Sequence, residues 1–302
     1  MHDLHELPKL RDGLSYLYVE HAVINRKYKA VEAWSEQGGI MIPAASLAVL
    51  MLGPGTSITH AAVLALADNG CSILWVGEDG TRFYAQGMGE TRKAHRLLRQ
   101  AALVSDPERR KQVVLNMYRA RFAEGLDPSL TLPQIRGLEG VRVRKAYAEA
   151  SRTYGVPWQG RRYDRSNWSY GDPVNRALSA ANALLNGLCH AAIVSGGYSP
   201  GLGFIHTGRH LSFVYDIADL YKVDITIPVA FATVSESQQN LEARVRQAGR
   251  TRFKENHLFE RIFPDIEALL GLTDAKALIP EDADDAFSAP VDLWEELLGE
   301  ER

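Results

Sequence analysis

Cysteine is nearly absent from the 302-residue chain, which has only Cys71 and Cys189, far apart in apolar sequence. They form no Cys-x-x-Cys pair, so they predict neither a zinc site nor a disulfide framework, and we expect buried, reduced thiols. Long hydrophobic runs are also lacking, since the longest, residues 44–52, is too short to span a bilayer. The first residues are too polar for a signal peptide. We therefore expect a cytoplasmic protein without a membrane partner.

Net charge is small, but it is unevenly distributed. The chain has 34 Lys and Arg against 37 Asp and Glu, a net of −3, which alone argues against a nucleic-acid partner. Between Arg82 and Arg165, however, 18 basic residues outnumber eight acidic ones, whereas residues 281–302 carry nine acids and one base. This asymmetry favours a basic surface for a polyanion and an acidic tail, although solvated helix faces produce similar runs.

The spacing of apolar residues predicts an α+β fold. Residues 14–84 are mainly typical of strands, at 14–19, 28–35, 39–43, 72–77 and 81–85, with one helix at 58–68 and a hairpin of type I′ character around 78–80. Helical spacing then predicts helices at 90–105, 107–125, 132–154 and 173–195, and another from Ser212. We expect a small β-rich N-terminal domain at residues 1–86, a larger all-helical domain at 87–280 and a flexible acidic tail at 281–302.

The strongest local signal for chemistry is His206, followed by the acidic pair Asp216 and Asp219. If Ser212 caps a helix, the two carboxylates lie three residues apart on one face and repel each other unless a cation lies between them. Mg²⁺ or Mn²⁺ prefers oxygen ligands, and an imidazole ligand favours tolerance of Mn²⁺. The plainer alternative is a helix start that carries acids, beside an isolated loop histidine.

Glu139 is a second signal, because it is a single acid among several bases. Its neighbours are Arg136, Arg142, Arg144 and Lys145. One reading is a surface ion pair. The functional reading is a carboxylate within a phosphate-binding surface, where a bound cation joins it to the substrate.

Taken together, these segments closely resemble the universal CRISPR-associated integrase, in its type I-E form. The matching segments are Gly203–Gly208, Ser212–Asp219, Leu52–Thr56, Trp75–Glu78, Arg136–Gly140 and Gly160–Asp164. The likeness runs from about Leu7 to Pro264, and one departure is Ser57, where relatives have arginine. In that family a β-rich domain precedes a helical catalytic domain, which agrees with the division expected from the apolar pattern.

The resemblance implies a set of site residues and partners. Glu139, His206 and Asp219 are expected to bind a catalytic Mg²⁺ or Mn²⁺, with Asp216 as a further acidic site residue. The resemblance also implies an asymmetric homodimer that joins a dimer of the small ferredoxin-like CRISPR-associated partner. The expected DNA-binding residues are Arg82, Arg136, Arg142, Arg144, Lys145, Arg161, Arg162, Tyr163, Tyr215 and Lys222.

The implied reaction is a metal-dependent transesterification. A 3′-hydroxyl of a double-stranded DNA with single-stranded 3′ ends attacks a phosphodiester of the CRISPR repeat, and water in its place makes the same site an endonuclease. Two other functions stay open: a general metal-dependent nuclease for branched or repair DNA, and a non-catalytic DNA-binding scaffold. The acidic tail, with its apolar residues between 293 and 298, is expected to dock on the small partner.

Overall fold

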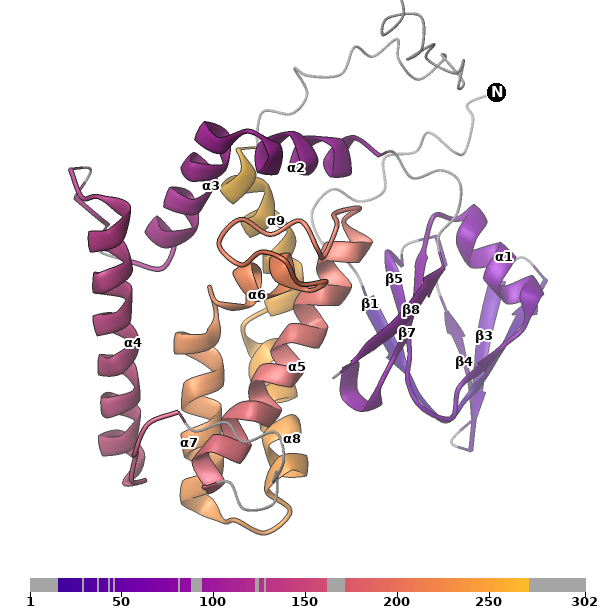
Figure 1. The fold of residues 1–302 in the computed structure, drawn as a ribbon. Helices are drawn as coiled ribbons and strands as arrows, with labels where there is room; N and C mark the ends of the chain where they lie inside the picture. Colours follow the sequence, from indigo (N-terminus) through magenta and orange to yellow (C-terminus); the bar gives the residue numbers. More distant parts are fainter. Residues whose placement is uncertain are drawn as a thin grey trace, which may run out of the picture. The chain divides into compact units, whose positions relative to one another are not determined.

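The computed structural model describes residues 16–271, except 29, 37, 43, 46, 81, 88–93, 123–124, 128 and 162–171 and the side chains of residues 79 and 95. The described residues as far as Leu270 belong to one compact unit. Strands and one helix come first in the chain and helices follow, so the α+β class is confirmed (Figure 1). The domain limits at residues 86 and 280 stay predictions, and the predicted acidic tail lies outside the described residues.

The N-terminal part contains two four-stranded sheets. One has the order β1 (Tyr16–Val19), β5 (Val49–Leu52), β7 (Ser72–Val76) and β8 (Phe83–Gly87), parallel except for the β7–β8 pair. The other has the order β4 (Gly38–Ile42), β3 (Ala30–Ser35), β2 (Val23–Lys27) and β6 (Ser57–Ile58), antiparallel except for the β2–β6 pair. Helix α1 (His60–Asp68) lies between β6 and β7 in the chain.

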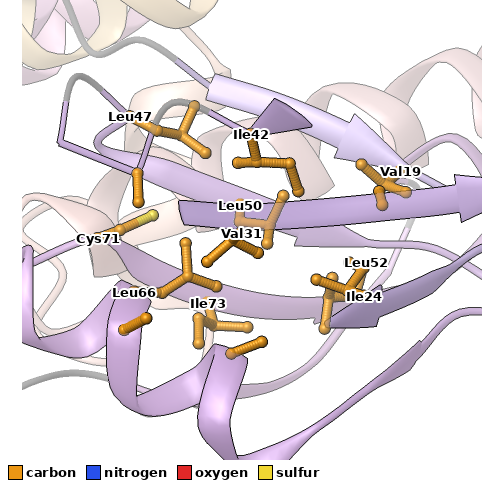
Figure 2. Close-up of a cluster of buried hydrophobic side chains, with 14 of the residues drawn as sticks. Val19, Ile24, Val31, Ile42, Leu47, Leu50, Leu52, Leu66, Cys71 and Ile73 are labelled. Carbon is orange, nitrogen blue, oxygen red and sulfur yellow. The ribbon is translucent and has the colours of Figure 1, made fainter. Parts of the chain in front are cut away.

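The core of this part is formed by side chains from both sheets and from α1. Figure 2 shows Val19 and Leu50 of the first sheet near Val31 and Ile42 of the second, with Leu66 of α1 beside them. Each of these residues is less than a tenth exposed. Because β5 is buried along its whole length, it is apolar throughout rather than alternating.

Several details of the predicted β region need correction. The predicted strands did not include β2 or β5. The helix predicted at 58–68 begins at His60, two residues later than expected, because Ser57 and Ile58 belong to β6. The predicted β7–β8 hairpin is present, but the turn is wrong: a 3₁₀ helix, Glu78–Gly80, occupies a six-residue connection instead of a type I′ turn. Both cysteines are buried thiols, as expected.

The helices after residue 94 are α2 (His95–Ser105), α3 (Pro107–Arg119), α4 (Leu132–Tyr154), α5 (Pro173–Ser195), α6 (Ser212–Ala218), a π-helix (Lys222–Thr226), α7 (Ile227–Glu236), α8 (Leu241–Glu255) and α9 (Leu258–Leu270). Helix α5 is the central one, packed against α6, α7, α8 and α9 (Figure 1). At Gly249 a methyl group would lie only 2.7 Å from Leu184, so this glycine allows α8 to approach α5 closely.

Helix α5 is also long and apolar enough to cross a membrane by length and composition alone. Of the most apolar 18-residue stretch of this helix, however, 67% is buried inside the structure. Burial of this extent is typical of the core helix of a soluble protein, so the helix is weak evidence for a membrane span. The cytoplasmic location stays a prediction.

Candidate functional site: an acid–histidine cluster among basic side chains

Asp216 and Asp219 lie on the same side of α6, as their spacing predicts, but in different surroundings. Asp216 is completely buried, whereas the Asp219 side chain, at the helix end, is 23% exposed. Both approach the same imidazole. The predicted N-cap is wrong by one residue: Leu211 is the cap, and the Ser212 hydroxyl instead exchanges hydrogen bonds with the backbone of Arg209.

His206 lies between the two carboxylates. Its Nδ1 is 2.7 Å from Oδ1 of Asp216, and its Nε2 is 3.9 Å from Oδ2 of Asp219. The hydrogen bond to Asp216, aided by the charges of both carboxylates, raises the pKa of His206 above its usual range, against the opposing effect of partial burial. A neutral imidazole that donates Nδ1–H to Asp216 presents the Nε2 lone pair toward Asp219.

The backbone before His206 is held by the same Asp216 carboxylate. It accepts N–H groups from Phe204 at 2.6 Å, Ile205 at 3.1 Å and His206 at 2.9 Å. Three backbone donors and one ring nitrogen satisfy a charged group that would otherwise be costly to bury. Asp216 therefore fixes both the position and the orientation of the histidine.

Two polar side chains from earlier helices hold the same loop. Gln100 of α2, which is completely buried, donates to the carbonyl oxygens of Ser199 and Leu202 at 3.0 and 2.9 Å. Arg110 of α3 donates through two nitrogens to the carbonyl of Phe204, at 3.1 and 2.8 Å. The loop thus connects α6 to α2 and α3 through hydrogen bonds.

Glu139 faces this cluster from α4, where it forms ion pairs with two arginines. Arg142 donates to both carboxylate oxygens at 2.9 and 3.3 Å. Arg121, just beyond α3, approaches Glu139 at 3.4 Å and Asp219 at 3.9 Å. Glu139 therefore forms ion pairs, which was one of the two expected readings. Arg121 is a cation that Glu139 shares with Asp219.

Lys222 completes the set of cations. Its Nζ lies 2.5 Å from Oδ1 of Asp219, three residues earlier. The short π-helix that Lys222 begins follows α6 after three residues, and π-helical turns occur frequently at functional sites. Tyr215 of α6 meets the ring of His206 edge-on, with centroids 5.9 Å apart.

Two of the predicted metal ligands, His206 and Asp219, lie close together, and Glu139 lies beyond Arg121. Adjacent ligands of an octahedral Mg²⁺ ion, each about 2.1 Å from it, lie about 3.0 Å apart, so His206 Nε2 and Asp219 Oδ2, at 3.9 Å, would have to approach each other to share an ion. The carboxylate that orients the histidine is the usual support of a metal-bound imidazole. In the described part of the chain, however, no group of three or more His, Cys, Asp or Glu is spaced to hold a metal. The donor types fit, and Arg121 lies between Glu139 and Asp219.

The predicted DNA-binding bases divide into two groups within the described residues. Arg142, Arg161 and Lys222 have partners within the protein; Arg161, although exposed, donates to the carbonyl and side-chain oxygens of Asn175 and to the hydroxyl of Ser179. The other four predicted bases in the described residues are exposed too: Arg82, Arg136, Arg144 and Lys145. Arg162 and Tyr163 lie outside the described residues.

Sequence reasoning missed Gln100, Arg110 and Arg121 as residues of this site. Gln100 and Arg110 differ in no visible way from other polar residues of their amphipathic helices. Arg121 is one base within a run of bases, and its burial, with a side chain 4% exposed, depends on the packing of α3 and α4. The only available signal was its position in the basic stretch that contains Glu139.

A histidine flanked by carboxylates and surrounded by arginine and lysine, on the helical part of an α+β chain, is typical of enzymes that act on phosphodiesters. A family model described as CRISPR associated protein Cas1 matches residues 118–258. A Thermus thermophilus protein named CRISPR-associated endonuclease Cas1 2 is 56% identical over 97% of this chain and 90% of its own length. The chain belongs to the Cas1 family of CRISPR-associated endonucleases.

Two further similarities agree with this assignment. CRISPR-associated endonuclease Cas1 from Escherichia coli is 39% identical and covers 94% of both chains. The crystal structure of a TtCas1–DNA complex has 59% sequence identity and a TM-score of 0.80, with 87% of this chain and 99% of that chain covered. The chain is thus a nuclease of CRISPR adaptation, from a family that is generally metal-dependent. Family membership also favours this function over a general repair nuclease or a non-catalytic scaffold.

Proposed function

We propose that this chain is the metal-dependent integrase of spacer acquisition, of the type I-E form. It joins the 3′-hydroxyl ends of a protospacer duplex to the CRISPR repeat. The observation that carries the proposal is the imidazole of His206, held by buried Asp216 with Nε2 facing Asp219. Glu139 lies on the other side of Arg121 and is the third proposed metal ligand, after His206 and Asp219.

In the proposed site, His206, Asp219 and Glu139 hold Mg²⁺ or Mn²⁺. When bound, the ion lowers the pKa of the attacking hydroxyl and neutralises charge on the phosphate. Asp216 keeps the Nε2 lone pair of His206 available by accepting Nδ1–H. Lys222 offsets the charge of Asp219. In the reaction the 3′-oxygen bonds to phosphorus as its proton leaves, and the repeat's own P–O bond breaks to release a 3′-hydroxyl.

DNA binding is proposed from two observations. The related TtCas1 was crystallised as a DNA complex. In this chain, exposed Arg136, Arg144 and Lys145 follow one another along α4, the helix that carries Glu139. Cations on one rigid helix bind phosphates largely without regard to sequence. We propose that these bases, which project from different sides of α4, contact the backbone of the incoming or the target DNA.

The assembly is proposed from the family resemblance. The chain forms a homodimer, and two dimers flank a dimer of the small ferredoxin-like partner. Residues 281–302, with their excess of acids, dock on that partner. Deletion of these residues is expected to weaken complex formation while dimerisation stays intact. Unchanged affinity for the partner would assign the tail a solubilising role only.

A strand-transfer assay tests the catalytic proposal. His206→Ala and Asp219→Ala are expected to lower Mg²⁺- or Mn²⁺-dependent integration by at least about a hundredfold without unfolding the protein. Exposed His210→Ala and Asp224→Ala are matched controls, because they remove the same side chains a few residues away. Full integration by either site variant would overturn the assigned metal site.

A further inference from the structure

Arg121 is a buried cation shared by two carboxylates of the site. Its side chain is 4% exposed, and it lies two residues beyond the end of α3. Nη1 lies 3.4 Å from Oε1 of Glu139 on α4, and Nη2 lies 3.9 Å from Oδ2 of Asp219 at the end of α6. The guanidinium therefore lies between two negative charges from different helices.

The contacts of Arg121 are loose for a buried ion. Charge-assisted hydrogen bonds to carboxylates are normally about 2.7–2.9 Å long, and both of its distances are longer. Within the described residues, its Nε and Nη2 make no hydrogen bond, although water does not reach them. The ring of Tyr118 lies 5.2 Å from its guanidinium carbon. Buried polar atoms without a hydrogen bond are uncommon in folded proteins, and each calls for an explanation.

Glu139 does not depend on Arg121 for a partner. Arg142 already contacts both of its carboxylate oxygens, at 2.9 and 3.3 Å. Arg121 therefore differs from Arg142 in that it also approaches Asp219. A divalent ion held by both carboxylates would meet the guanidinium of Arg121 in the space between them, and like charges at such a distance repel strongly.

We propose that Arg121 is the built-in counter-cation of the acidic site and that it competes with the divalent metal for Glu139 and Asp219. This inference rests on the proposed metal site. Arg121 neutralises the two carboxylates before the metal binds, and it leaves the space between them when the three ligands converge. It is a positioning residue that sets the metal affinity of the site. A protein cation that must be displaced makes metal binding weaker than the ligands alone would give.

Mn²⁺ binding to the full-length protein tests the competition. The dissociation constant is measured by isothermal titration calorimetry, or by electron paramagnetic resonance of the free ion. Arg121→Met is expected to bind Mn²⁺ at least about tenfold more tightly than the wild type, because a repelling charge is removed. Arg119→Met is the matched control, since Arg119 is exposed two residues earlier and the change in net charge is the same.

The outcomes separate the two proposals. Equal or weaker Mn²⁺ binding by Arg121→Met would overturn the competition but leave the metal site intact. If neither the wild type nor any variant binds Mn²⁺, both the proposed metal site and the competition are overturned. Arg121→Lys keeps a charge at the position and is expected to retain an affinity closer to that of the wild type. It also serves where Arg121→Met does not fold.

Thermal unfolding in the presence of a chelator tests the counter-cation role without any metal or activity. Arg121→Met is expected to lower the melting temperature, because Glu139 and Asp219 then face each other without the shared cation. Adding Glu139→Gln removes one of the two repelling charges, so Arg121→Met should cost less in that background. The same loss with or without Glu139→Gln would show that Arg121 contributes packing only.

Discussion

A carboxylate that is completely buried and accepts three backbone N–H groups has little freedom to do more than hold its neighbours. Asp216 is such a group, and its remaining contact is Nδ1 of His206. Asp219 is a quarter exposed, and its partners are the side chains of Lys222, Arg121 and His206. We therefore propose that Asp216 positions the histidine and that Asp219 meets the metal and the substrate.

Conversion of each aspartate to asparagine distinguishes these roles. Asp216→Asn turns an NH₂ group toward backbone donors, so we expect the free energy of unfolding to fall by about 2–4 kcal/mol. Asp219→Asn removes a partly exposed charge and should change it by less than about 1 kcal/mol, while strand transfer is lost. Urea unfolding measures both. Equal stability of the two variants would contradict a structural role for Asp216.

Because His190 of α5 is buried, we expect the free energy of unfolding to fall at acidic pH. Burial, with a smaller contribution from His210, lowers its pKa from 6.5 to about 4. The unfolded chain therefore binds this proton at a higher pH than the folded chain, so the stability is complete above about pH 6.5 and is lost as the pH falls toward 4. His190→Gln should reduce the slope of unfolding free energy against pH in this window by up to about 1.4 kcal/mol per unit. Exposed His60→Gln is the control.

Not every site residue was predictable from the sequence. Glu139, His206 and Asp219 stand out because their residue types are unusual where they occur, an acid among bases and a histidine before two acids. Arg121 is a base among bases, and only the packing of α3 and α4 makes it a buried counter-cation. Arg161 shows the opposite case: its sequence suggests DNA contact, but its guanidinium is hydrogen-bonded to Asn175 and Ser179.

At the scale of elements, the helices with clear end signals were the most predictable. Helix α4 starts after Thr131, whose backbone N–H donates to the side chain of Gln134 at 2.8 Å, and it ends before Gly155 in the left-handed region. Strand β5 lacks such signals, since a short apolar run between parallel neighbours does not alternate. Strand β2, with Asn25, Arg26 and Lys27, is too polar to be recognised.

Two glycines, Gly137 within α4 and Gly155 at its end, differ in whether the structure requires a glycine there. A methyl group at Gly137 would meet no atom of the described residues within 4 Å. Gly137→Ala should therefore raise the free energy of unfolding by about 0.5–1 kcal/mol, because glycine is a poor helix former. Gly155→Ala, at a backbone φ of +64°, should lower it by about 1 kcal/mol or more. Urea denaturation measures both, and a loss of stability in Gly137→Ala would show that the glycine is required for packing.

At the scale of the whole molecule, the fold divides a uniform run of basic residues into two functions. Arg121 and Arg142 face the acids of the site, and Arg110 holds the loop before His206. Arg136, Arg144 and Lys145 remain exposed, and no ion pair to another described residue is seen for these three. The net charge of the stretch therefore overstates the number of cations that are available to DNA.

The salt dependence of DNA binding measures which cations are available. If Arg144 contacts a phosphate, Arg144→Ala should weaken binding to every duplex about equally and reduce the slope of log affinity against log salt by about one. Arg82→Ala should behave in the same way. Arg161→Ala is the informative counterpart, because its guanidinium has protein partners; it should lower stability and leave the slope unchanged. Titration with a fork-ended duplex at several salt concentrations decides between these outcomes. An unchanged slope in Arg144→Ala would mean that α4 does not carry the DNA, whereas a reduced slope in Arg161→Ala would mean that Arg161 leaves Asn175 to bind a phosphate.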